Sequence, residues 1–325
     1  MTEEYGGHGR KLLGMVVSPE AVAHAFPPSE ARIAGLPLVC NHCCKLTLPG
    51  VLMSESETVL VEIENAVATV TLNRPAKRNA MSPTLHLEMA DVLERLRYET
   101  TSRVLVITGA GESFCAGMDL KQFFVELKDN PPEFDRIFRL ATDWRYRTLR
   151  HYPKPTIAMI NGYCFGGAFS IVEGCDLAFA AKEATFGLSE INFKHYPGGS
   201  VSKSLANILR PRDALFYAMT GRTFKGDRAA EIGLVNAAYP LVNLKREVMA
   251  LAEEIAQKDP DALTACKDGY RFSLEMTADA AINYAAAKSD QLTLRQKDSW
   301  RSEGIGDFLQ GKYRPGLGGP QKAKS

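Results

Sequence analysis

The sequence has no excess of charge of either sign. The 325-residue chain contains 39 lysines and arginines against 38 aspartates and glutamates, which gives a formal net charge of +1. Proteins that bind nucleic acid or an anionic membrane surface usually carry a basic balance or a basic patch. We therefore expect neither partner. With 45% hydrophobic and 24% charged residues, the composition is that of a soluble globular protein with one large domain or two small ones.

Long apolar runs and evenly paired cysteines are also missing. No apolar stretch reaches the roughly 18–20 residues that a membrane-spanning helix needs, so we expect no membrane segment. The seven cysteines are an odd number, and four of them stand among apolar residues: Cys115, Cys164, Cys175 and Cys266. This pattern favours buried free thiols over disulfides, and it predicts a reducing, cytoplasmic location.

Residues 1–52 lack the regular patterning of the rest. They mix Gly, Pro and His with short apolar pieces, and no clear secretory signal is present. A short cluster offers four metal ligands, Cys40, His42, Cys43 and Cys44. A structural zinc site usually needs a second ligand pair, and none of suitable spacing follows, so we predict no metal site. We expect residues 1–52 to be a poorly ordered extension. Alternatively, Met53 is the true start.

From Met53 onward, strand and helix patterns alternate. Apolar or alternating runs predict strands at Val59–Ile63, Val67–Leu72 and Val104–Thr108. Apolar residues at helical spacing predict a helix over Leu85–Leu96, and Ser82 followed by Pro83 marks its start. The fold class is therefore α/β. We expect a core at 53–258 and a C-terminal helical region at 259–325 that docks on another subunit.

The stretch from Lys154 to Glu190 contains the predicted site. An apolar strand, Thr156–Ile160, leads to the pair Gly166-Gly167 and then to a helix of small residues. Glycines in such a turn let the backbone approach a bound group, and the free N–H groups at a helix start favour negative charge. A similar turn is built on Ala116-Gly117. An anion or developing oxyanion held beside the Glu190 carboxylate would form an enzyme site.

Four ordered segments resemble the crotonase (enoyl-CoA hydratase/isomerase) superfamily: NRPAKRNAMS, FCAGMDL, NGYCFGGAFS and ATFGLSEINF. Within it, NRPAKRNAMSPTL, AGMDLK and ATFGLSEIN are most similar to the 4-hydroxycinnamoyl-CoA (feruloyl-CoA) hydratase-lyases. The resemblance runs from about Met53 to the C-terminus. It implies a crotonase-type spiral of ββα units, followed by C-terminal helices that assemble homotrimers, often paired into hexamers.

The resemblance also implies a reaction and its residues. Backbone N–H groups of Met118 and Gly167 would form an oxyanion hole for a CoA thioester, and Glu190 would be the general acid/base. Ser170 stands where two-glutamate hydratases carry a second Glu, and it would hold water or a hydroxyl group. The implied enzyme is a lyase that hydrates an aryl-substituted α,β-unsaturated acyl-CoA and cleaves the product to an aromatic aldehyde and acetyl-CoA. No cofactor is implied, because coenzyme A enters within the substrate.

The same resemblance places the rest of the substrate. Coenzyme A would meet Lys77, Arg78 and Ala116, together with Phe308 and Lys312 of a neighbouring protomer. The acyl pocket would contain Phe123, Phe169, Phe193, Tyr196, Tyr284 and Ala286. Hydroxycinnamoyl members bind a para-hydroxyl through two tyrosines, and the matching positions here are Phe123 and Ala286. Tyr284 lies two residues away, about 200° around a helix. The acyl group therefore stays open.

Two other functions remain as alternatives. One is a hydratase or isomerase of aliphatic or alicyclic acyl-CoA, and the other is a non-catalytic scaffold of the same fold. Retention of Glu190 and of both glycine turns argues against the scaffold. A serine hydrolase is disfavoured, because GGAFS is not the G-x-S-x-G elbow and no histidine is placed by sequence to activate Ser170.

Overall fold

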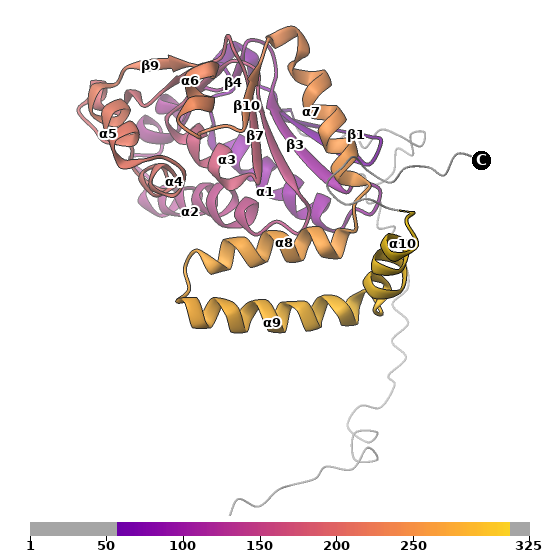
Figure 1. The fold of residues 1–325 in the computed structure, drawn as a ribbon. Coiled ribbons are helices and arrows are strands. Elements are labelled where there is room, and N and C mark those ends of the chain that lie inside the picture. Colours follow the sequence, from indigo (N-terminus) through magenta and orange to yellow (C-terminus); the bar gives the residue numbers. More distant parts are fainter. Residues whose placement is uncertain (1–56, 313–325) are drawn as a thin grey trace, which may run out of the picture. The chain divides into compact units, whose positions relative to one another are not determined.

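The computed structural model describes residues 57–312, which belong to one compact unit, Leu48–Ser325 (Figure 1). The predictions for residues 1–52, for Met53 as a start and for zinc at Cys40, His42, Cys43 and Cys44 lie outside the described residues.

Two sheets form the framework of this unit. The large sheet has the order β1-β2-β3-β5-β7-β10 and the small one β4-β6-β8-β9. The large sheet consists of β1 (Val59–Glu64), β2 (Val67–Leu72), β3 (Val104–Gly109), β5 (Thr156–Ile160), β7 (Leu177–Ala181) and β10 (Ala237–Tyr239). The small sheet consists of β4 (Ser113–Cys115), β6 (Tyr163–Phe165), β8 (Thr185–Gly187) and β9 (Thr223–Lys225). Neighbours pair in parallel, except for β1 with β2 and β8 with β9.

The chain repeats a ββα unit. Each of the pairs β3–β4, β5–β6 and β7–β8 gives one strand to the large sheet and the next to the small sheet, before helical segments follow. The helices up to this point are α1 (Pro83–Tyr98), α2 (Pro131–Thr142), α3 (Phe169–Gly174), α4 (Val201–Ile208), α5 (Pro211–Thr220), α6 (Gly226–Glu231) and α7 (Leu241–Ala256). Shorter helical turns cover Pro75–Lys77, Leu120–Val125, Asp143–Thr148, Gly166–Ala168 and Ser189–Phe193. This arrangement confirms the predicted spiral.

Local sequence explains these elements well. Strands β3 and β5 are buried along their whole length, as expected for central parallel strands that read as unbroken apolar runs. The turn between β1 and β2 places Asn65 and Ala66 at φ of 49° and 63°, the backbone that a tight hairpin requires. At the start of α1, the Ser82 side chain accepts a hydrogen bond of 3.2 Å from the Leu85 N–H. This confirms the predicted helix start.

A helical hairpin follows the core. It consists of α8 (Pro260–Ser273) and α9 (Ala278–Arg295), and a turn at Trp300–Ile305 leads to α10 (Gly306–Leu309) (Figure 1). The predicted boundary at residue 258 falls in the turn between α7 and α8. Arg271 of α8 donates to the carbonyl oxygens at the end of α3, and Lys267 lies 2.7 Å from the Asp176 carboxylate. The role of this hairpin in oligomerisation stays a prediction.

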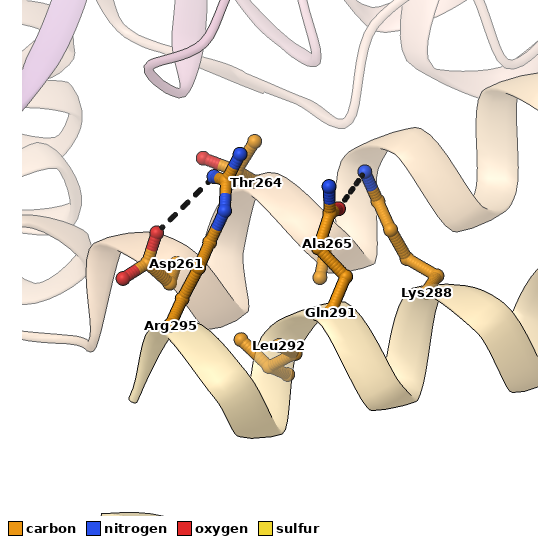
Figure 2. Close-up of a pocket in the computed structure, with 7 residues that line it drawn as sticks. All are labelled: Asp261, Thr264, Ala265, Lys288, Gln291, Leu292 and Arg295. Atoms are coloured by element: carbon orange, nitrogen blue, oxygen red, sulfur yellow. Dashed lines mark hydrogen bonds and ion pairs between the residues drawn. The ribbon is translucent and has the colours of Figure 1, made fainter. Parts of the chain in front are cut away.

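Polar contacts line a small cavity between α8 and α9. Figure 2 shows the Arg295 side chain reaching toward Asp261 at one end, with the two groups 3.5 Å apart. At the other end, Lys288 contacts Gln291 at 3.2 Å. The volume of about 10 Å³ holds roughly one water molecule. This cavity is therefore a feature of the hairpin, too small for an acyl-CoA.

One cysteine prediction is wrong. Cys115, Cys164 and Cys175 are buried and free, but Cys266 is exposed. Helix α8 contacts the core through Lys267 and Arg271, and the helical rotation turns Cys266 outward. Within residues 57–312, no helix is long and apolar enough to cross a membrane. In the same range, no group of His, Cys, Asp and Glu is arranged to hold a metal ion.

Candidate active site

Three residues singled out in the sequence follow three neighbouring strands of the small sheet. Met118 lies three residues beyond β4, Gly167 two beyond β6, and Glu190 three beyond β8. These strands run in parallel as direct neighbours. The carboxyl ends of parallel strands meet at one edge of a sheet, where ligands of α/β proteins commonly bind. The topology therefore brings together residues that are far apart in the chain.

The two glycine turns touch each other. An ideal Cβ added to Gly117 would lie 3.5 Å from the Gly167 nitrogen and 2.9 Å from the Phe165 carbonyl oxygen. An ideal Cβ on Gly167 would lie 3.5 Å from the Met118 Cγ. Gly117 and Gly166 also have φ of +92° and +50°, which favour glycine. Since Gly167 lies in the first turn of a helical segment, its N–H has no acceptor inside that segment.

The Glu190 carboxylate lies directly across this turn. An ideal Cβ on Gly166 would lie 2.8 Å from Glu190 Oε1. The second oxygen, Oε2, is buried and has no hydrogen-bond partner within the described residues. Burial raises the pKa of Glu190 above its ordinary 4.5, and contacts with its own backbone N–H and with His195 offset part of this rise. A carboxyl group whose pKa is raised by burial is a better proton acceptor than an exposed one and can return the proton afterwards.

Arg145 is a site residue that the sequence analysis missed. Its guanidinium is buried and donates to the Gly167 carbonyl oxygen at 3.0 Å and to the Ala141 carbonyl oxygen at 2.8 Å. Burial lowers the pKa of Arg145 to about 10. A signal was present, because Ile137, Ala141 and Arg145 share one helical face and the first two are apolar and buried. Arg145 therefore fixes the carbonyl group of Gly167, the residue whose N–H is the predicted oxyanion donor.

Two further sets of contacts fix the Met118 turn. Arg74 pairs with Asp119 at 3.0 Å, and both side chains are largely buried. Asn79 is fully buried at φ 56°, and its side-chain amide donates to the Ser113 carbonyl oxygen at 2.7 Å. The loop before α1 is thus tied to β4 and to the residue after Met118. These contacts limit the movement of the Met118 N–H.

Three of the residues predicted to bind coenzyme A, Lys77, Arg78 and Ala116, lie close together. The Arg78 carbonyl oxygen accepts from the Ala116 N–H at 2.9 Å, so two of them are directly joined. The Arg78 guanidinium lies 4.9 Å from the centre of the Tyr163 ring, and both Lys77 and Arg78 are exposed. Two cationic side chains are therefore available to phosphate groups beside the Gly117 turn. Their role in binding coenzyme A stays a prediction.

Ser170 is fully buried in the helix that follows the glycine pair. Its hydroxyl lies 2.8 Å from the Ser200 hydroxyl, a partner that the sequence analysis did not identify. The predicted role of Ser170 in holding water or a substrate hydroxyl stays a prediction.

The predicted acyl-pocket residues do not form one cluster of contacts in this chain. Phe123 is fully buried, with the rings of Phe124 at 5.1 Å, Phe134 at 5.4 Å and His86 at 5.8 Å. Its neighbourhood is therefore largely aromatic. None of these three ring neighbours carries the hydroxyl group that a tyrosine would present at this position.

None of the other predicted pocket residues has a ring contact with Phe123. Phe169 packs edge-on against Phe186 and Phe224 at 6.2 and 6.5 Å. Phe193 and Tyr196 are 64% and 63% exposed, on the loop after Glu190. They are available to a substrate or to another subunit.

The C-terminal candidates lie on the hairpin and the segment after it. Tyr284 faces α8, with its ring 5.5 Å from that of Phe272, while Ala286 is exposed. The two therefore point in different directions, as their spacing predicts. Phe308 is half exposed, and Lys312 pairs with Asp307 at 3.2 Å. A role for Tyr284, Ala286, Phe308 or Lys312 in another protomer's site stays a prediction.

The Enoyl-CoA hydratase/isomerase family profile matches residues 62–313. The chain belongs to the enoyl-CoA hydratase/isomerase family. The chain is 50% identical over 264 residues to the hydroxycinnamoyl-CoA hydratase-lyase of Pseudomonas fluorescens. The matched region covers 80% of this chain and 95% of that relative. It is 31% identical over 257 residues to the 2,3-dehydroadipyl-CoA hydratase of Escherichia coli (strain K12), and this match covers 78% of this chain and 95% of that relative.

A solved structure supports the same family. The crystal structure of an enoyl-CoA hydratase from Mycobacterium smegmatis matches with a TM-score of 0.72 and 27% identity, covering 78% of this chain and 96% of that one. The family predicted from four short segments is thereby confirmed, as is the similarity to hydroxycinnamoyl-CoA hydratase-lyases.

Proposed function

We propose that this protein is a hydratase-lyase for an aryl-substituted α,β-unsaturated acyl-CoA of the hydroxycinnamoyl or feruloyl type. The observation that carries the proposal is the position of Glu190, whose buried and unpartnered oxygen lies beside the glycine turn that contains Gly167. The similarity to the Pseudomonas fluorescens hydratase-lyase at 50% identity supports the same reaction.

In the first step, the Glu190 carboxylate takes a proton from water. The hydroxide adds to the β-carbon, and the double-bond electrons move onto the thioester oxygen. The N–H groups of Met118 and Gly167 stabilise this oxyanion, and each such donor contributes about 3–4 kcal/mol in comparable oxyanion holes. Glu190 then returns the proton to the α-carbon, so the carboxylate is regenerated and the product is a β-hydroxyacyl-CoA.

In the second step, the same carboxylate takes the proton of the β-hydroxyl group. The Cα–Cβ bond breaks, the β-carbon becomes an aldehyde carbonyl, and the bonding electrons pass into the thioester enolate. Protonation of that enolate by Glu190 gives acetyl-CoA. Atoms and charge balance without any cofactor, because coenzyme A is part of the substrate and one carboxyl group serves both steps.

The acyl group proposed here is aromatic. Phe123 belongs to an aromatic cluster with Phe124 and Phe134, and a wall of this composition would suit an aryl side chain. Phe123 has no hydroxyl group to bind a para-phenol, so recognition of a ring substituent would fall to other groups. Exposed His195 and Tyr196, whose rings stack at 5.0 Å, are polar candidates on the loop after Glu190.

We also infer a homotrimer or a dimer of trimers that works in the cytoplasm. Exposed apolar side chains on α5 and α9 support subunit contacts, among them Met219 at 70%, Ile282 at 68% and Leu294 at 80% exposure. The free thiols of Cys115 and Cys164 fit a reducing compartment.

The decisive experiment compares three thioesters, feruloyl-CoA, cinnamoyl-CoA and crotonyl-CoA. The purified full-length protein is incubated with each, and aldehyde, acetyl-CoA and hydroxyacyl-CoA are quantified by chromatography. We expect aldehyde and acetyl-CoA in equal amounts from at least one aryl substrate. Hydration of crotonyl-CoA without aldehyde from either aryl substrate would instead assign an ordinary hydratase.

Two variants identify the acid/base. Glu190→Gln should lower turnover at least about a hundredfold, because the amide cannot transfer the proton. The matched control is Glu183→Gln, an exposed carboxylate just before β8 whose contact with the Leu241 N–H an amide oxygen can keep. We expect control activity near that of the unmodified protein. Normal turnover in Glu190→Gln would rule out the mechanism.

A further inference from the structure

Ser170 belongs to a row of buried hydroxyl groups that ends at a buried carboxylate. Its Oγ lies 2.8 Å from Ser200 Oγ and 3.4 Å from Ser204 Oγ. Ser204 Oγ in turn lies 3.4 Å from Glu173 Oε2. Ser170 and Ser204 are completely inaccessible, and Ser200 and Glu173 are 7% and 6% exposed. The predicted substrate-holding serine is therefore surrounded by groups that can orient its proton.

Glu173 fixes one end of this row. Its carboxylate pairs with the buried guanidinium of Arg150 and accepts from the Asn207 side-chain amide at 2.9 Å. An ionised carboxylate can only accept hydrogen bonds. Ser204 has a single hydroxyl proton, which the charged acceptor attracts more strongly than a neutral hydroxyl does. Ser204 is the donor in both of its contacts, and the charged carboxylate draws its single proton away from Ser170, so the Ser170 hydroxyl has Ser200 as its exchanging partner.

Ser200 is the adjustable member of the row. Either hydroxyl of the Ser170–Ser200 pair can donate to the other. Ser200 occupies the N-cap position of α4, but its side chain makes no capping hydrogen bond. Its hydroxyl is thus not committed to holding the helix. It can rotate between donating to Ser170 and accepting from it.

In its predicted role of holding water and the substrate hydroxyl, Ser170 would need to behave in opposite ways in the two proposed reaction steps. During hydration, the attacking water gives one proton to Glu190, and its other O–H needs an acceptor. During cleavage, the β-oxygen loses its proton to Glu190, and the developing alkoxide needs a donor. A lone serine whose proton is fixed in one direction would suit only one of these steps.

We propose that Ser200 is a positioning residue that lets Ser170 reverse its hydrogen bond between hydration and cleavage. The inference rests on the proposed function. In hydration, Ser170 donates to Ser200 and accepts from water. In cleavage, Ser200 donates to Ser170, which donates to the β-oxygen until the Cα–Cβ bond breaks. The serines gain and lose no proton overall, because Glu190 carries the proton that is transferred.

The test measures the two steps separately in Ser200→Ala. Hydration starts from the aryl enoyl-CoA that the unmodified protein uses, and cleavage starts from the corresponding β-hydroxy-β-aryl acyl-CoA. We expect kcat for cleavage to fall about tenfold, the effect of one lost hydrogen bond to a charged oxygen. Hydration should fall less than about threefold, because Ser170 there accepts from a neutral water, and a hydrogen bond between neutral groups contributes less than one to a developing alkoxide. KM should stay unchanged in both assays.

Two further variants separate positioning from structure. Ser200→Thr keeps the hydroxyl and should restore the ratio of cleavage to hydration. Ser202→Ala is the matched control, since Ser202 is an exposed serine of the same helix whose hydroxyl donates to the Pro197 carbonyl oxygen. It should leave both rates unchanged. Equal losses in the two steps for Ser200→Ala, or no loss in either, would overturn the inference.

A double-mutant cycle tests whether Ser200 acts through Ser170. In a Ser170→Ala background, Ser200→Ala should cause no further loss of cleavage, because the hydroxyl that it orients is already gone. Losses that multiply would show an independent role and overturn the inference. Aldehyde formation by the unmodified protein distinguishes a failure of the proposed function from a failure of the Ser200 proposal. If it forms no aldehyde from either substrate, the proposed function fails and the inference with it. If it forms aldehyde, only the variants decide.

Discussion

The Arg145 guanidinium donates a hydrogen bond of 3.0 Å to the Gly167 carbonyl oxygen. A buried cation thus holds the residue whose N–H faces the Gly117 turn. Its Nε–H also donates to the Ala141 carbonyl oxygen, so the side chain bridges a helix and the glycine turn. Few substitutions could replace both contacts, because only arginine offers several donors in a fixed planar fork.

Replacement of Arg145 by methionine should therefore impair turnover more than substrate binding. Two buried carbonyl oxygens lose their donor, which costs about 1–3 kcal/mol each and is partly offset by removal of a buried charge. We expect kcat to fall at least about tenfold and the melting temperature to drop by a few degrees. Arg147→Met is the control, since this exposed arginine lies two residues away and pairs only with Asp143 within the described chain. Equal effects of the two changes would contradict the prediction.

The raised pKa of Glu190 predicts opposite effects on activity and stability. Activity needs the carboxylate, so the rate should fall as the pH drops through a pKa above 4.5. The folded state binds the Glu190 proton more tightly than the unfolded state, so the stability linked to it is present below pH 4.5 and is lost as the pH rises through the raised pKa.

Glu190→Gln should therefore be inactive but more stable than the unmodified protein at pH 7.5. The stability difference should vanish toward pH 4.5. Urea unfolding at several pH values measures it. A less stable variant at pH 7.5 would contradict the prediction.

His86 should make the protein less stable in mild acid. It is fully buried and accepts a hydrogen bond of 2.9 Å from the Trp144 indole through Nδ1. Burial, and next the charge of Arg145, lower its pKa well below 6.5. The unfolded state binds a proton near pH 6.5 and the folded state does not. Stability is therefore complete above that pH and is lost below it by up to about 1.4 kcal/mol per pH unit.

In His86→Gln this loss should be absent, because glutamine does not titrate and its oxygen can accept from Trp144. Urea unfolding at pH 7.5, 6.0 and 5.0 compares this variant with the unmodified protein. His195→Gln, a change at an exposed histidine, should keep the acid dependence. Parallel curves for His86→Gln and the unmodified protein would refute the prediction.

The described cysteines should differ sharply in reactivity. Burial raises the pKa of Cys115 to about 12 and of Cys175 to about 12, and it raises that of Cys164 well above the ordinary value. Buried, protonated thiols react slowly with iodoacetamide. Cys266 is exposed, so peptide mapping after brief alkylation of the native protein should find it modified first. The other three should react only in denaturant. Rapid native labelling of Cys115 would disprove their burial.

Local patterns predicted the framework because they act over a few residues. Strand β2, the Ser82 cap of α1 and the two glycine turns follow from alternation, capping and backbone freedom, all of which are visible in short segments. Glu190 could also be placed, because it follows a recognisable segment and its strand pairs in parallel with the others.

Contacts between distant segments could not be read in the same way. The Ser170–Ser200 pair joins two helices that are 30 residues apart, and no periodicity relates them. Arg145 had a signal in its apolar helical face, but its acceptor at Gly167 depends on how that helix packs. Cys266 was misplaced because apolar neighbours in sequence do not determine which side of α8 faces the core.

The attachment of Arg271 to the end of α3 limits how this protein can be divided or recombined. Helix α3 has only six residues, and Arg271 donates to the carbonyl oxygens of Glu173, Gly174 and Cys175 at its end. The C-terminal hairpin is thus not a detachable module. A chimera that exchanged it for another hairpin would keep the end of α3 in place only if the new helix brought an arginine to the same position. Substitutions in the hairpin and in the segment at the end of α3 are therefore constrained together.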